Sequence, residues 1–102
     1  MIDTEEQLQA WIADNPVPPG LHGYEEWRDE VVKIFGVRNR TMLLHLLECG
    51  NDAEQYAAII ILRVALGYDG YKVGYGGSAY YELTAEDGSK MVVHPSRDHA
   101  DA

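Results

Sequence analysis

The sequence predicts one α+β domain over residues 1–96, with about four helices followed by a three-stranded antiparallel β-meander packed on the last helix. Three observations lead to this order. Apolar residues recur at helical spacing up to residue 66, and five glycines and five tyrosines gather between 66 and 83. Beyond residue 69 the pattern changes to short apolar runs separated by turn residues. A chain of 102 residues suffices for one modest core, and residues 97–102 read as a polar tail.

The first two predicted helices are amphipathic and are separated by a proline-rich break. Residues 3–14 begin with a cap at Asp3 or Thr4, and acids crowd the first turn, where the helix dipole favours them. Three prolines within 16–19 then favour an extended path. A second helix follows over 24–35, with Gly36 as its C-cap. The expected buried stripes are Leu8, Trp11 and Ile12 in the first helix, and Trp27, Val31, Ile34 and Phe35 in the second.

The third and fourth predicted helices carry the largest apolar surfaces. The third spans 40–49 and ends at Gly50; its apolar residues include Met42, Leu43, Leu46 and Leu47. The fourth spans 53–66 and ends at Gly67, and Asp52 with Gln55 resembles a capping box at its start. Because this helix is apolar nearly all round, we expect it in the middle of the core.

Three strands are predicted at 70–75, 78–84 and 89–94. Gly76-Gly77 predicts the first hairpin turn, and Asp87-Gly88 predicts the second. The glycines follow a helix and separate strands, so they do not form a phosphate-binding loop, which requires glycines between a strand and a helix. The sequence does not decide which strand face is buried, since a shift of one residue inverts every side chain.

The net charge of −9 limits the classes of function. Residues 1–30 hold eight acids and one base, residues 31–47 hold three bases and no acid, and residues 48–102 hold nine acids and four bases. This balance argues against direct nucleic-acid binding, which needs clustered Lys and Arg. The apolar run at 57–61 is too short for a bilayer, and one cysteine with no recognisable signal peptide favours a reducing cytoplasm. We expect no cofactor and no metal.

The acids and tyrosines indicate a surface for a basic protein partner. Exposed tyrosines offer contact area with a polar tip, and nearby acids suit a partner rich in Arg. The alternative is an ordinary core with a solvated acidic surface. The candidate binding residues are Asp69, Tyr71, Tyr75, Tyr80, Tyr81 and Glu82 in the meander, and Glu25, Glu26, Asp29 and Glu30 on the second helix. The leading hypothesis is therefore a non-catalytic acidic binding module, in character like phage-encoded anti-CRISPR inhibitors or DNA mimics, which would act in the host cytoplasm.

Residues 50–95 also contain an ordered set of short motifs. They are Gly50-Asn51-Asp52 before the buried helix, Leu62-Arg63-Val64-Ala65-Leu66-Gly67 at its end, Val73-Gly74-Tyr75, Ser78-Ala79-Tyr80-Tyr81-Glu82, Asp87-Gly88 and Val93-His94-Pro95. In order and approximate spacing this segment resembles the core of transglutaminase-like, papain-related thiol enzymes. The resemblance implies a helix followed by a meander, with a catalytic Cys, His and Asp. Here those three positions hold Asp52, Ser78 and His94, so the resemblance implies a degenerate core without its catalytic residues.

Three alternatives stay open. The first is a thiol hydrolase or acyltransferase that uses Cys49 and His94, because a thiolate needs an adjacent imidazole. In the second, "LGYDGY" with "MVVHPSR" is similar to the C-terminal strands of phage-associated ADP-ribosyltransferase-like domains, although the helical first part does not supply that fold's NAD-binding strands. The third is a structural homodimer formed through the leucines of the third helix and the tyrosine-rich sheet. His94, Asp98, His99 and Asp101 are not expected to fix a metal, which needs several immobilised ligands.

Overall fold

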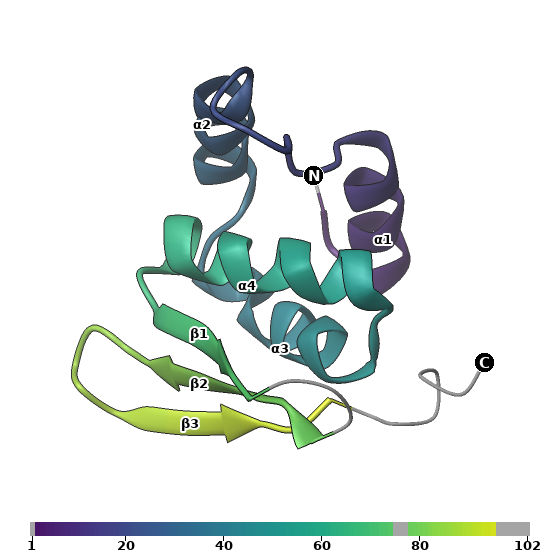
Figure 1. The fold of residues 1–102 in the computed structure, drawn as a ribbon. Coiled ribbons are helices and arrows are strands. Elements are labelled where there is room, and N and C mark those ends of the chain that lie inside the picture. The colour runs from purple at the N-terminus through teal and green to yellow at the C-terminus, as the bar shows by residue number, and fades with distance from the viewer. Residues whose placement is uncertain (1, 75–77, 96–102) are drawn as a thin grey trace.

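A computed structural model describes residues 2–74 and 78–95 and confirms the α+β architecture (Figure 1). In the described residues a single 3₁₀ turn and four α-helices precede a three-stranded antiparallel sheet of order β1-β2-β3. The elements are α1 (Glu5–Asp14), α2 (Tyr24–Ile34), η1 (Val37–Asn39), α3 (Arg40–Cys49), α4 (Asp52–Leu66), β1 (Asp69–Val73), β2 (Tyr80–Thr84) and β3 (Lys90–Val93).

Helix α4 crosses the middle of the molecule, as its lack of a polar face predicts (Figure 1). Helices α1 and α2 lie on one side of it, and α3 and the sheet lie on the other. Gln55 and residues 57–62 are buried, while Tyr56 and Arg63 stay exposed. The meander packs on α4 mainly through β1, and β3 also contacts α3.

Most of the predicted apolar stripes form the core. The buried members are Leu8, Ile12, Trp27, Val31, Phe35, Leu43, Leu46 and Leu47. Trp11, Ile34 and Met42 are partly buried against the same cluster. Trp11 joins the first two helices, since its ring centroid lies 5.2 Å from Phe35 and 6.1 Å from Trp27. Leu43, Leu46 and Leu47 belong to this chain's own core, whereas Leu44 is only partly buried, so the homodimer through this helix and the sheet stays a prediction.

Two predicted helix caps are wrong by one residue. Asn51, not Asp52, caps α4: its Oδ1 accepts the Glu54 amide at 2.8 Å, and Glu54 Oε1 accepts the Asn51 amide at 2.9 Å. Helix α2 ends at Ile34, and Gly36 is extended with φ −156° rather than left-handed. Of the two predicted caps for α1, Thr4 is the one that forms, and Gly67 ends α4 with φ 77° as predicted.

The strands begin and end within one or two residues of the predicted positions. Asp69–Val73 pairs with Tyr80–Thr84, which pairs in turn with Lys90–Val93. Gly88 has φ 89° in the second turn, as Asp87-Gly88 predicts. Tyr75, the predicted Gly76-Gly77 turn and the tail from residue 96 on, including Asp98, His99 and Asp101, lie outside the described residues.

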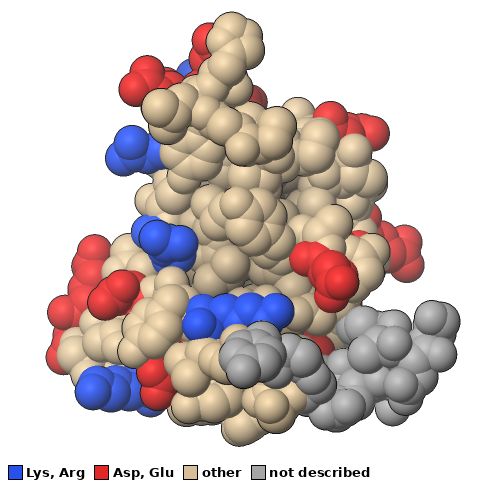
Figure 2. Space-filling model, viewed as in Figure 1, with Lys and Arg blue, Asp and Glu red and all other residues tan. Residues whose placement is uncertain are grey.

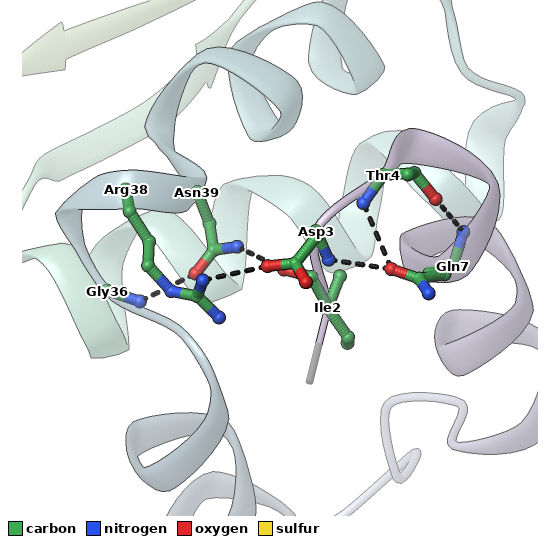
Figure 3. Close-up of polar contacts among 7 residues, drawn as sticks. All are labelled: Ile2, Asp3, Thr4, Gln7, Gly36, Arg38 and Asn39. Carbon is green, nitrogen blue, oxygen red and sulfur yellow. Dashed lines mark hydrogen bonds and ion pairs between the residues drawn. The ribbon is translucent and has the colours of Figure 1, made fainter.

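The N-terminal segment is attached to η1 through the buried side chain of Asn39 (Figure 3). Its Nδ2 donates to the Ile2 carbonyl at 3.0 Å, and its Oδ1 accepts the Gly36 amide at 3.0 Å. The second bond holds Gly36 in its extended conformation. Beside it, the Arg38 guanidinium forms an exposed ion pair with Asp3 at 2.8 Å. These contacts fix the start of the chain against the segment that leads into α3.

Candidate protein-binding face of the sheet

The two faces of the meander differ in composition because side chains alternate along each strand. The face toward the helices carries Gly70, Tyr81, Leu83 and Val93, all of them buried. The opposite face is covered by no helix or strand of the described residues. We call it the outer sheet face and define it by Tyr71, Val73, Tyr80, Glu82, Val92 and His94.

Tyr71, Glu82 and Val92 lie in one row across the three strands of this face. Tyr71 pairs with Glu82 and Glu82 pairs with Val92, and the Tyr71 hydroxyl donates to Glu82 Oε2 at 2.7 Å. This hydrogen bond and the negative charge of Glu82 raise the pKa of Tyr71 above its usual 10.0. Glu82 forms no ion pair with a described residue, and Lys90, in the next row of the same face, lines a shallow hollow together with Tyr71 and Glu82.

A second row lies next to the first. Val73 pairs with Tyr80, and the Tyr80 ring lies with its centroid 5.5 Å from that of His94, just after β3. Tyr71 and Val92 are each about half exposed, at 53% and 51%. The outer sheet face therefore presents aromatic and branched apolar side chains around one carboxylate on its central strand.

Tyr81 has to be removed from the predicted binding residues. It is buried, with 5% exposure, and its hydroxyl donates to Gln55 Oε1 at 3.2 Å. Burial raises its pKa, and the charge of Asp52 adds to the effect. Of the two adjacent tyrosines, Tyr81 belongs to the core, and Tyr80 remains on the outer sheet face.

The other predicted acids form two groups. Asp69 is exposed on β1, at the beginning of the sheet. Glu25, Glu26, Asp29 and Glu30 are exposed on α2. Because α2 and the sheet lie at opposite ends of the molecule, the α2 acids and the tyrosines do not share one surface (Figure 1). Val73 and Val92 were not among the predicted binding residues, although alternation along a strand puts Val73 on the same face as Tyr71.

The residues proposed for thiol chemistry have other neighbours. Cys49 is the exposed last residue of α3, and its sulfur lies 3.9 Å from Glu48 Oε1. A carboxylate does not activate a thiolate as an imidazolium does. The His94 ring packs on Tyr80. Asp52 is the first residue of α4. Ser78 precedes β2, and His94 directly follows β3. The catalytic pair Cys49 and His94 remains an untested prediction.

Comparison with protein-family models, curated proteins and solved structures found no match. The resemblance to transglutaminase-like and ADP-ribosyltransferase-like domains thus stays an expectation. No group of three side chains suited to a metal ion occurs within residues 2–74 and 78–95. Over the same residues, no helix has the length and apolar character needed to cross a membrane.

Proposed function

We propose that this protein is a non-catalytic acidic binding module whose outer sheet face binds a basic protein surface. The observation that carries the proposal is the half-buried carboxylate of Glu82 on the outer sheet face, between Tyr71, Tyr80 and Val92. An arginine of the partner can pair with this carboxylate while its planar guanidinium stacks on a tyrosine ring. The surrounding apolar atoms would exclude water from the pair, which is the arrangement found at interaction hot spots.

The charge of the whole chain supports such a partner. A net charge of −9 steers a basic surface toward the protein and speeds the encounter. The acids on α2 contribute to this long-range attraction, although they lie away from the outer sheet face. A phage or mobile-element inhibitor that occupies a basic surface of its target is one biological setting in which these properties are useful.

Affinity capture from the native host, followed by mass spectrometry, tests the proposal. Wild-type protein, Glu82→Lys and Asp14→Lys serve as baits; the two variants make the same charge change, and Asp14 is exposed at the end of α1. We expect a basic partner that wild type and Asp14→Lys retain and that Glu82→Lys loses. The affinity for this partner should fall as salt rises, because screening weakens the attraction.

Equal retention by Glu82→Lys and Asp14→Lys would show that the outer sheet face is not the binding surface. An affinity that is the same at low and high ionic strength would argue against electrostatic recognition.

A further inference from the structure

A second candidate surface lies along the exposed side of α4 and differs in charge from the outer sheet face. A groove of about 600 Å³ runs between α2 and the part of α4 from Tyr56 to its C-terminal end. Arg28 from α2 and Arg63 from α4 both line it, together with Tyr24 and Tyr56. Tyr56, Ile60, Arg63 and Gly67 are spaced by four, three and four residues, so they form one stripe of α4.

The two arginines have no anionic partner within the described chain. Neither forms an ion pair with a described residue, although the protein has an excess of acids. Arg63 lies near the end of α4, where the helix dipole favours a cation. Arg28 is the fifth residue of α2, where the dipole offers no such reason. A guanidinium binds carboxylate oxygens in a planar, bidentate way, so a pair of them in one groove suits an anionic ligand.

An apolar cavity continues this surface toward the start of α4. It has a volume of about 350 Å³ and is lined by residues that include Ile12, Val17, Ala53 and Ala57. Glu54 borders it, but its Oε1 accepts the Asn51 amide. Tyr56, which is 57% exposed, lines both the cavity and the arginine groove, so it forms the ridge between them. In Figure 2, which has the view of Figure 1, uncharged surface covers the centre of this side, and most acidic groups lie toward the outline.

We propose that this surface, the α4 groove, binds an acidic peptide segment of a partner protein, with one apolar side chain in the cavity and carboxylates on Arg28 and Arg63. Ala53 and Arg63 are ten residues apart, which is about 15 Å along a helix. An extended peptide covers that distance in about five residues. Asp69 lines the end of the groove next to the sheet. Its negative charge repels the acidic residues of the peptide, so these residues are expected beside the two arginines. The site is independent of the outer sheet face.

The probe is a short fluorescein-labelled peptide with one leucine followed, about five residues later, by a run of glutamates. Changes in the chemical shifts of ¹⁵N-labelled protein show where the peptide binds, and fluorescence anisotropy gives the affinity of the peptide. We expect shifts along α2 and α4 rather than in the sheet. Arg28→Glu and Arg63→Glu should each weaken binding by about tenfold or more, as loss of a charge-assisted contact does. Lys33→Glu is the matched control, because Lys33 is an exposed base on α2 that does not line the groove.

Two altered probes and one small anion complete the test. A probe with glutamines in place of the glutamates should bind more weakly, and its affinity should no longer change in Arg28→Glu or Arg63→Glu. A probe with serine in place of the leucine should also bind more weakly. The proposal is overturned if the glutamine probe binds as tightly as the glutamate probe, or if the serine probe does. It is also overturned if inorganic phosphate alone displaces the peptide at similar concentration, if the shifts map to the sheet, or if about 1 mM probe causes none.

Discussion

The Tyr71 hydroxyl donates a 2.7 Å hydrogen bond to Glu82 Oε2 across two neighbouring strands of the outer sheet face. The bond holds the carboxylate at a fixed place beside an aromatic ring, so the side chains are ordered before a partner arrives. Ordering in advance reduces the entropy lost on binding. The same bond has a consequence that can be measured in the isolated protein, because it favours the protonated form of Tyr71.

We expect Tyr71 to titrate above its usual pKa of 10.0 and to return toward that value in Glu82→Gln. The substitution removes the negative charge and weakens the hydrogen bond, which are the two largest causes of the shift. Ring chemical shifts followed against pH give the pKa of each tyrosine. Tyr81 is the internal control, since its raised pKa arises from burial and from Asp52 and should not change in Glu82→Gln. A Tyr71 pKa that is the same in both proteins would contradict the hydrogen bond.

The raised pKa of Tyr81 predicts that the protein loses stability in alkaline solution. A group whose pKa is higher in the folded state than in the unfolded state contributes its full stabilisation at pH values below the unfolded pKa. This stabilisation is lost as the pH rises through the folded pKa, because the unfolded state loses its proton first. The free energy of unfolding should therefore fall as pH rises through about 10 and above. Tyr81→Phe should reduce this dependence. At neutral pH the same variant should lose about 1 kcal/mol, because its hydrogen bond to Gln55 is missing.

Urea unfolding at neutral and alkaline pH measures both effects. Tyr71→Phe is the matched control for the neutral-pH loss, because the same hydroxyl is removed from an exposed residue. Equal losses in Tyr71→Phe and Tyr81→Phe at neutral pH would contradict a structural role for the Tyr81 hydroxyl.

The helices could be predicted from the sequence because their apolar residues recur at regular spacing. The cap of α4 could not, since Asn51 and Asp52 are both good capping residues and each has a Glu or Gln three positions later. Burial of Gln55, whose Nε2 donates to the Gly50 carbonyl at 2.8 Å, removes it from capping. The choice between Asn51 and Asp52 therefore depends on the tertiary packing that buries Gln55, which the local sequence does not show.

The outer sheet face could be predicted only in part, for a similar reason. Two adjacent tyrosines, 80 and 81, satisfy either orientation of β2, so the strand alone does not select one. The close approach of β1 to α4 at Gly70 selects the orientation of the sheet. Because Gly70 pairs with Leu83, Leu83 faces α4 as well, and Tyr81, two residues before it on β2, lies on the same face. The α4 groove was not predicted, because Arg28 and Arg63 are 35 residues apart and only the packing of α2 on α4 brings them to one surface.

Gly70→Ala should destabilise the protein by about 1–3 kcal/mol, because β1 has no room for a methyl group there. A Cβ at this position would lie 2.5 Å from Leu83 Cδ2 and 2.8 Å from Ile59 Cδ1. Gly20→Ala is the control, since no atom lies within 4 Å of the added Cβ. Thermal or urea unfolding compares the two variants. If Gly70→Ala unfolds like Gly20→Ala, the ends of the Leu83 and Ile59 side chains make room for the methyl group, and the absence of a side chain at position 70 is not required.

The contacts that attach the N-terminal segment predict unequal losses of stability at neighbouring residues (Figure 3). Asn39→Ala should cost about 1–3 kcal/mol, because Asn39 is only 1% exposed and its loss leaves the buried Ile2 carbonyl without its donor. Arg38→Ala should cost less than about 1 kcal/mol, because its ion pair with Asp3 joins side chains that are 48% and 59% exposed. Urea unfolding of both variants, repeated at high salt, measures the difference. Salt should reduce only the small effect of Arg38→Ala, since screening acts on the exposed charges and not on the buried amide. An Arg38→Ala loss as large as that of Asn39→Ala would mean that the exposed ion pair, and not the buried amide, holds the start of the chain on η1.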